Sequence, residues 1–240
     1  MSTSTRDQQN IIRFPGETEE YRRARDELLE AEIALRRQTE AVAAQLQRLP
    51  LGGTLPTDYA FEEWDPGACA ARTVRLSELF ETGKDTLCVY SFMFNPGATG
   101  RPLEVACPMC TSMLDGIDGE LPHITQRINF AVATKAPIER FRAHAHTRGW
   151  RHARLLSSAN TTYNRDYRAE ASDADQRPMA TVFVRRYGTI HHFWSSELLM
   201  APLEPGEGPR HVDYMWPLWA ILDRTPGGRG DDWMPRLEYR

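Results

Sequence analysis

"EVACPMCTSMLDGI", residues 104–117, places Cys107 and Cys110 two residues apart where an apolar, helix-like pattern begins. The pattern predicts a helix that begins at this pair, with Pro108 in its first turn, where the missing N–H of proline costs nothing. A helix start stabilises a thiolate through its unpaired N–H groups and the positive end of its dipole. Cys110 would lie one turn further on, within reach of a mixed disulfide at Cys107. The stretch therefore predicts a nucleophilic Cys107 and a resolving Cys110.

The segments on either side predict an alternating α/β layout. The apolar run "TLCVYSFMF" (86–94) is typical of a strand buried on both faces. Residues up to 71 read as a loop and residues 74–80 as a short helical turn. After the cysteines, the pattern predicts a helix that Gly116, Gly119 and Pro122 should kink or divide. Further predicted elements are a strand at 128–134, a helix at 137–149, a strand at 150–158, a polar insertion, and a hairpin at 179–198 with its turn near Tyr187-Gly188.

Residues 18–49 contain no Gly or Pro and predict one long helix, which Pro50 ends. Every seventh position is apolar, but the positions between them are only half apolar, which is weak for a coiled coil. Docking on the chain's own body is therefore favoured over pairing with a second subunit, and a homodimer stays open. We expect an N-terminal helical arm (1–50), a central domain (51–199) and a C-terminal extension (200–240) that packs on the domain. The apolar stripe consists of Tyr21, Leu28, Leu35, Val42 and Leu49.

Composition limits the classes of function. The chain has 240 residues, and 29 basic against 33 acidic side chains give a net charge of −4, so no nucleic-acid partner is expected. The sequence shows neither the apolar core of a secretory signal nor an apolar run that could span a membrane, which predicts a cytoplasmic protein. Thiols are kept reduced in that compartment, so a close cysteine pair indicates redox chemistry or metal binding rather than a structural disulfide.

Several blocks of sequence resemble a known family. They are "FPGETEEYRRARDELLEAEIALRRQTEAVA", "LFETGKDTLCVYSFMF", "CPMCTSMLDGIDG", "RINFAVATKAP", "RGWRHARLLSS" and "RHVDYMWPLWAILDRTPGGRGDDW". With them the chain resembles the thioredoxin-like family catalogued as domain of unknown function 899. The resemblance implies a mixed central sheet flanked by helices and a dithiol chemistry at the cysteine pair, without an established substrate.

The cysteine site departs from that of ordinary thioredoxins in two respects and has a counterpart of one further feature. Thioredoxins have Gly-Pro between the cysteines, whereas this chain has Pro108-Met109. They bury an acid in the strand beneath the cysteines, and the run at 86–94 offers none. They also carry a cis-proline opposite the pair, and Pro178 stands where that proline would fall, although a proline at a strand start is usually trans. Pro108, Met109 and Pro178 are thus the expected supporting residues.

The leading hypothesis is a dithiol–disulfide oxidoreductase that needs no cofactor, with an unknown disulfide substrate or thiol reductant as partner. One alternative is a copper or other soft-metal binding protein, in which His191, His192 or His211 would join the thiolate pair. Another is a binding or scaffold protein that keeps the fold with an inert pair. Zinc is not expected, because there is no second CxxC. Peroxidase activity lacks support, because the residue three positions before Cys107 is Glu104 rather than the Thr of the peroxiredoxin pattern.

Two cysteines remain outside the pair. Cys88 lies within the apolar run, which predicts a buried core thiol. Cys69 lies in "DPGACAAR" and reads as a loop residue.

Overall fold

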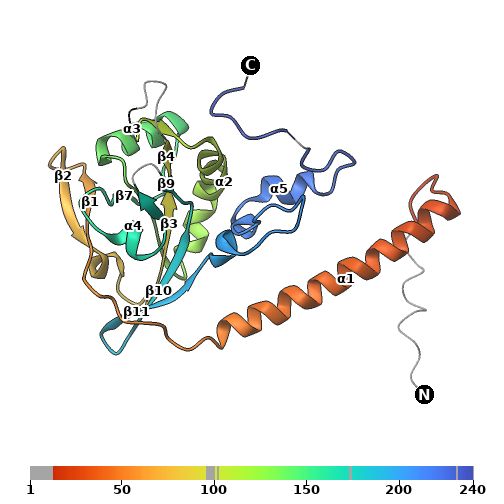
Figure 1. The fold of residues 1–240 in the computed structure, drawn as a ribbon, viewed down its shortest axis with the longest axis horizontal. Helices are drawn as coiled ribbons and strands as arrows, with labels where there is room; N and C mark the ends of the chain where they lie inside the picture. The colour runs from red at the N-terminus through yellow and green to blue at the C-terminus, as the bar shows by residue number, and fades with distance from the viewer. Residues whose placement is uncertain (1–12, 96–100, 102, 173–174, 231, 240) are drawn as a thin grey trace. The chain divides into compact units, whose positions relative to one another are not determined.

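The computed structural model describes residues 13–95, 101, 103–172, 175–230 and 232–239, and the chain divides into two compact units, 1–50 and 51–240 (Figure 1). The first unit contains the helix α1 (Glu19–Gln47), so the predicted long helix is confirmed. Thr18 caps it, because its Oγ1 accepts a hydrogen bond from the N–H of Tyr21 at 3.1 Å. Two acidic residues in the first turn also suit the positive end of the helix dipole.

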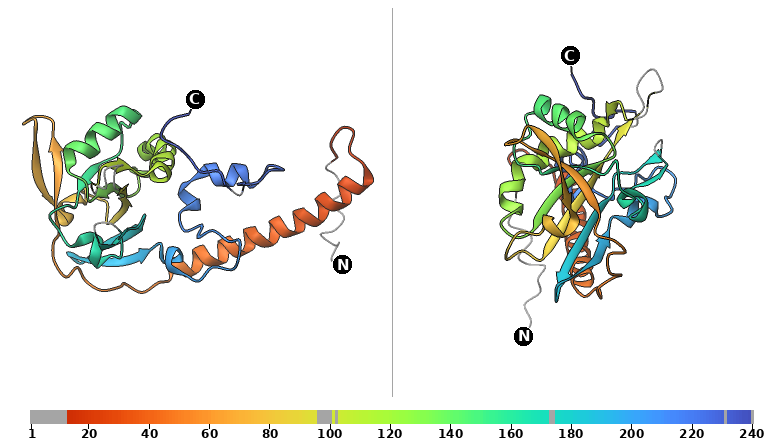
Figure 2. Two further views of the ribbon diagram at one scale, coloured as in Figure 1. Left: turned by 45° about the horizontal axis from the view of Figure 1, so that its top comes forward. Right: turned by 90° about the vertical axis from the view of Figure 1, so that its left-hand side faces the viewer.

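The second unit is built on a mixed seven-stranded sheet in the order β11-β10-β3-β6-β7-β1-β2. β3 runs parallel to β6, and β6 runs parallel to β7, whereas β10 is antiparallel to both β3 and β11. The hairpins β10–β11 and β1–β2 form the two edges (Figure 2). The strands are β1 (Ala60–Asp65), β2 (Ala70–Arg75), β3 (Thr86–Phe92), β6 (Asn129–Thr134), β7 (Leu155–Ser157), β10 (Ala180–Arg186) and β11 (Thr189–Ser195).

Short elements complete the unit. Two small two-stranded sheets pair β4 with β5 and β8 with β9. Their strands are β4 (Phe94–Asn95), β5 (Val105–Ala106), β8 (Glu170–Ser172) and β9 (Asp175–Gln176). The helices are α2 (Pro108–Ile124), α3 (Ile138–Arg148), α4 (Tyr163–Asp166), α5 (Pro217–Leu222) and the 3₁₀ helices η2 (Leu76–Leu79), η3 (Glu197–Met200) and η4 (Asp213–Met215).

Alternate side chains of β3 contribute to two cores on opposite faces of the sheet. Cys88, Tyr90 and Phe92 pack with residues of α2, α3 and α5 in one core. Leu87 and Val89 pack with η2 and α4 in the other core. The strand is buried on both faces, as its continuous apolar sequence predicts, and α5 lies beside α2 (Figure 1).

The unit β3-α2-β6, with the hairpin β10–β11 on the other side of β3, is the thioredoxin-like arrangement that the resemblance implies, and this expectation is confirmed. The hairpin turns at Tyr187-Gly188, as predicted. Their φ angles of 52° and 79° are the positive values that a two-residue turn of the favoured type requires. No helix among the described residues has the length and hydrophobicity needed to cross a membrane.

The predicted division of the helix after the cysteines is wrong. α2 runs without a break for 17 residues and ends just after Pro122. A glycine costs about 1 kcal/mol relative to alanine inside a helix, which the burial of side chains such as Met113, Leu114 and Leu121 outweighs. Pro122 lies in the last turn, where few hydrogen bonds remain to be lost.

The prediction of a loop up to residue 71 is also wrong, because β1 and β2 form a hairpin there and Val74 belongs to β2. β2 is an edge strand, with Val74 its one buried residue. Such a strand carries a polar, mostly exposed sequence without the apolar run that marks a central strand. The helical turn predicted at 74–80 is present as η2.

Candidate functional site

Cys107 is the N-cap residue of α2, and its place is fixed by backbone contacts at the end of β3. Its N–H donates to the carbonyl oxygen of Met93 at 3.0 Å, and its own carbonyl accepts from the N–H of Thr111 at 2.9 Å. Pro108 follows at the first helical position, as predicted. β4 follows β3 and pairs with β5, so that Phe94 lies opposite Ala106. This pairing places the start of α2 next to the end of β3. Sequence reasoning does not find this pairing, because both strands are only two residues long.

Cys110 lies one turn into α2 and is buried, with 2% of its surface exposed, beside a Cys107 that is 5% exposed. The hydroxyl of Tyr90 on β3 donates a hydrogen bond to the Cys110 Sγ at 3.2 Å. The thiol of Cys110 in turn hydrogen-bonds to the Cys107 sulfur. The three side chains therefore form a buried chain from phenol to inner thiol to outer sulfur. Both cysteines are free thiols in this structure.

The two thiols of the pair have opposite pKa shifts. The hydrogen bond from Cys110, helped by the backbone N–H groups of Cys110 and Met109, lowers the pKa of Cys107 to about 7, although burial opposes this shift. Burial, together with the bond to Cys107 and its charge, raises the pKa of Cys110 well above its ordinary value. Burial also raises the pKa of Tyr90, so its hydroxyl stays protonated and remains a donor. The first proton of the pair is therefore lost from Cys107 near neutral pH, while Cys110 keeps its proton.

Two contacts found only in the structure flank the pair. Thr111 Oγ1 lies 3.0 Å from His144 Nε2, which ties the first turn of α2 to α3. Burial lowers the pKa of His144, so the ring is neutral near pH 7. The second contact is the hydrogen bond from Tyr90 to Cys110. In the sequence, the only indication of it is that Tyr90 shares a face of the strand with Cys88 and Phe92. A tyrosine in an apolar run nevertheless reads as core, and so its contact with Cys110 was missed.

Pro178 lies against the end of β3, because the next residue, Met179, accepts a hydrogen bond from the N–H of Ser91 at 2.8 Å. The bond before Pro178 is trans, since the described residues contain no cis peptide bond. The carbonyl oxygen of Pro178 accepts a hydrogen bond from His211 Nε2 at 3.1 Å. Pro178 thus differs from the cis-proline of thioredoxins and is joined to the C-terminal segment through His211.

The histidines considered as metal ligands are engaged elsewhere. His191 Nδ1 lies 3.3 Å from the carbonyl oxygen of Gly52, and His192 Nε2 lies 2.9 Å from Ser195 Oγ. The described part of the chain contains no group of three or more His, Cys, Asp or Glu side chains placed to hold a metal ion. No specific observation therefore favours the soft-metal alternative.

The remaining cysteines lie where the sequence predicts. Cys88 is buried in β3, and burial raises its pKa to about 12. Cys69 is exposed in the turn between β1 and β2.

Comparison with solved structures finds several peroxiredoxins. Peroxidoxin BcpB from Mycobacterium tuberculosis matches 70% of this chain and 94% of its own at 16% identity and a TM-score of 0.44. Thioredoxin peroxidase I from Plasmodium yoelii matches 78% and 100% at 15% identity and a TM-score of 0.43. The mitochondrial 2-Cys peroxiredoxin of Plasmodium falciparum matches 74% and 98% at 14% identity and a TM-score of 0.42.

Comparison with curated proteins finds no match. The model of one protein family does match, and it covers residues 12–239, which include the cysteine pair, the central sheet and the C-terminal segment that carries His211. On this match over nearly its whole length, the chain belongs to the family described as bacterial protein of unknown function, DUF899.

Proposed function

We propose that the chain is a dithiol–disulfide oxidoreductase in which Cys107 is the nucleophile and Cys110 the resolving thiol. One observation carries the proposal: Cys107 is the N-cap residue of α2 and lies beside the inner, buried thiol of Cys110. The hydrogen bond from Cys110 lowers the pKa of Cys107 towards neutral pH. A thiolate is the attacking species in thiol–disulfide exchange, and a pKa near the ambient pH gives the best balance between thiolate fraction and nucleophilicity. No cofactor is needed for this chemistry.

The exchange runs in two steps. In the first, the Cys107 thiolate attacks one sulfur of the substrate disulfide, the substrate S–S bond breaks, and its other sulfur leaves as a thiolate that takes up a proton. In the second, Cys110 loses its proton and attacks the Cys107 Sγ, which breaks the mixed disulfide and releases the second substrate thiol. The protein pair thereby gives two electrons to the substrate, and the two substrate thiolates take up one proton from Cys110 and one from the solvent. An external thiol reductant restores the pair, and the same steps in reverse would oxidise a substrate dithiol.

Tyr90 supports the second step. The Cys110 thiolate must form in a buried site, where an unpaired charge is costly. The hydroxyl of Tyr90 already donates to the Cys110 sulfur, and this hydrogen bond becomes stronger when the sulfur is charged. Tyr90 thus stabilises the resolving thiolate, a role distinct from that of the buried acid in thioredoxins.

A redox titration tests the proposal. The purified protein is equilibrated in glutathione buffers of graded potential, and the state of Cys107 and Cys110 is followed by thiol alkylation and mass spectrometry. We expect a reversible disulfide within the cytoplasmic range in the wild type and in Cys88→Ala, and none in Cys107→Ser. Thiols that stay reduced at every potential would exclude the proposal.

Two further predictions concern the setting of the protein. A cytoplasmic location suits a pair that cycles through a reduced state. A homodimer also stays a prediction, based on the heptad stripe that contains Leu28 and Leu35 and on the aromatic C-terminal segment. Light scattering of the wild type and of Leu28→Glu/Leu35→Glu tests it, because charges on the stripe would leave only monomers.

A further inference from the structure

A cavity of about 340 Å³ adjoins Met109, the residue between Pro108 and Cys110. Residues of the C-terminal segment, between 206 and 234, form the rest of its wall. His211 also lines it, and this side chain holds the carbonyl oxygen of Pro178. The cavity therefore adjoins Met109 directly, and His211 connects its wall to Pro178. Its apolar wall consists of Met109, Val212, Trp216, Trp219, Trp233 and Met234.

The aromatic part of the wall is attached to the core of the redox site. Trp216 and Trp219 are buried in the same core as Cys107 and Cys110, and α5, which carries Trp219, packs on α2. Ring contacts link Trp216 to Trp219 at 5.2 Å and Trp219 to Trp233 at 6.0 Å between centroids. Such edge-to-face pairs fix the ring positions, so the cavity keeps its place relative to the cysteines.

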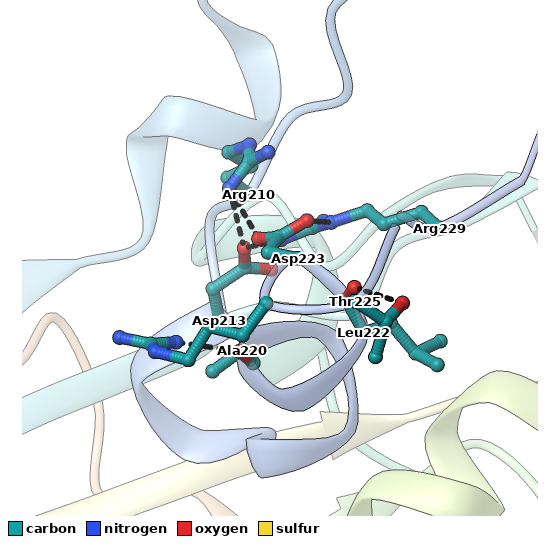
Figure 3. A network of polar contacts seen from close by, with 8 residues as sticks. Arg210, Asp213, Ala220, Leu222, Asp223, Thr225 and Arg229 are labelled. Carbon is teal, nitrogen blue, oxygen red and sulfur yellow. Dashed lines mark hydrogen bonds and ion pairs between the residues drawn. The ribbon is translucent and has the colours of Figure 1, made fainter. Parts of the chain in front are cut away.

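The charged residues near the cavity compensate one another in a closed network (Figure 3). Arg229 pairs with Asp213 at 2.5 Å and with Asp223 at 2.6 Å. Arg210 pairs with the same two carboxylates, at 3.6 Å and 3.0 Å. The hydrogen bond from Arg229 lowers the pKa of Asp223 to about 2, so the network stays ionised near neutral pH. Both cations are thus already neutralised.

The other titratable groups of the wall do not favour an anion either. Burial lowers the pKa of His211, whose Nε2 donates to Pro178, and the ring is therefore neutral near pH 7. Glu207 adds a carboxylate, which accepts the N–H of Glu204. An apolar floor with no unpaired cation suits an uncharged, apolar occupant.

We propose that this cavity binds a large apolar or aromatic side chain that flanks the reactive cysteine of a disulfide-bonded polypeptide. The inference rests on the proposed function, because it assigns the cavity to the substrate of the Cys107 exchange. Met109 is two residues from Cys107 and lines the cavity, whereas Cys107 does not. A side chain in the cavity would therefore lie beside the reacting sulfur. A residue next to the cysteine of a substrate peptide would take such a position. The volume is at the lower end of the range for ligand pockets and fits one or two side chains.

The test uses two peptides of one sequence, each with a single cysteine activated as a 2-thiopyridyl mixed disulfide, followed by Trp in one and by Ser in the other. Cys69 is replaced by Ser in every protein compared, because this exposed thiol would also react. Release of thiopyridone then reports the attack of Cys107, and bis(2-hydroxyethyl) disulfide gives the rate without a flanking residue. We expect the wild type to react about tenfold faster with the Trp peptide, which corresponds to the burial of one aromatic side chain. Equal rates with the two peptides, together with a normal reaction of the small disulfide, would overturn the inference and leave the proposed function standing. No reaction of Cys107 with any of the three would overturn both.

Substitutions in the cavity wall test whether the preference for the Trp peptide arises there. Trp233 is 41% exposed, so we expect Trp233→Ala to keep the fold and to bring the ratio of the rates with the Trp and Ser peptides close to one. Trp219 is the buried tryptophan of the same wall, and Trp219→Ala should also bring this rate ratio close to one. The matched control is Trp64→Ala, because this partly buried tryptophan lies on β1, away from the cavity. We expect the control to keep the ratio and the rate with bis(2-hydroxyethyl) disulfide. A ratio that persists in both cavity variants would contradict the assignment.

Discussion

The hydroxyl of Tyr90 donates a hydrogen bond of 3.2 Å to the Sγ of Cys110, across the interface between β3 and α2. This contact joins the centre of the sheet to the helix that begins at Cys107. It also gives the inner thiol a donor that remains protonated, since burial raises the pKa of Tyr90 well above its ordinary value. The inner thiolate can therefore form in a buried site without a neighbouring cation.

Tyr90→Phe should slow the resolving step while leaving the first attack largely intact. The variant keeps the ring but removes the donor, and one hydrogen bond to a charged group contributes about 1.5 kcal/mol, or about tenfold in rate. Rapid quenching and mass spectrometry would then show a mixed disulfide accumulating on Cys107. Tyr163→Phe is the control, because Tyr163 is equally buried but lies in the core on the other face of the sheet. Equal slowing of both steps would argue against this role of Tyr90.

The position of the cysteine pair could be predicted from the sequence because its determinants are local. The spacing of Cys107 and Cys110, the proline between them and the apolar pattern that follows are enough to place the pair at a helix start. Tyr90 is 20 residues away in sequence from Cys110, and its role depends on which face of β3 meets α2. A single sequence without a known strand–helix packing does not supply that information.

The reactivity of Cys107 should titrate with a midpoint near pH 7. Below this value, the thiolate fraction, and with it the rate of alkylation by iodoacetamide, falls about tenfold per pH unit. In Cys110→Ala the midpoint should move to higher pH, because the hydrogen bond from Cys110 is the main reason for the lowered pKa of Cys107. Peptide-resolved mass spectrometry measures both profiles. A wild-type midpoint at the ordinary thiol value of about 8.5 would contradict the prediction.

The four cysteines should differ in their modification under native conditions at neutral pH. Cys69 is exposed and should react first, followed by Cys107 through its thiolate. Cys88 should resist, because it is buried and burial raises its pKa to about 12, and Cys110 should resist for the same physical reason. Mapping of alkylated peptides over time checks this order, with the unfolded protein as the reference in which all four react. Early labelling of Cys88 in the native state would show that the core around β3 opens.

The fold was predictable where burial leaves a clear apolar pattern, as in β3 and β6, and was missed where it does not. β1 and β2 form an edge hairpin with mixed polar side chains, so their sequence resembles a loop. The predicted break in α2 followed from the local costs of Gly116, Gly119 and Pro122, which the packing of the helix on the sheet outweighs. A local pattern contains no information on that packing energy.

The position of α2 depends on a buried carboxylate. Asp118 accepts three backbone hydrogen bonds, from the N–H of Arg151 at 2.8 Å and from those of His152 and Ala153 at 2.9 Å each. They tie the second half of the helix to the segment that leads into β7. Asp118→Ala leaves these donors without their acceptor, and we expect it to lower the free energy of unfolding by about 3 kcal/mol.

Urea denaturation followed by circular dichroism measures this loss, with Glu120→Ala as the matched control. Glu120 is an exposed acidic residue on the same helix, and its replacement should change the free energy of unfolding by less than about 0.5 kcal/mol. Asp118→Asn should fall between the two, because its amide oxygen can still accept some of the hydrogen bonds. A loss in Asp118→Ala as small as that of the control would mean that water replaces the carboxylate at little cost. In that case the packing of α2 on the sheet would position Cys107 without the help of Asp118.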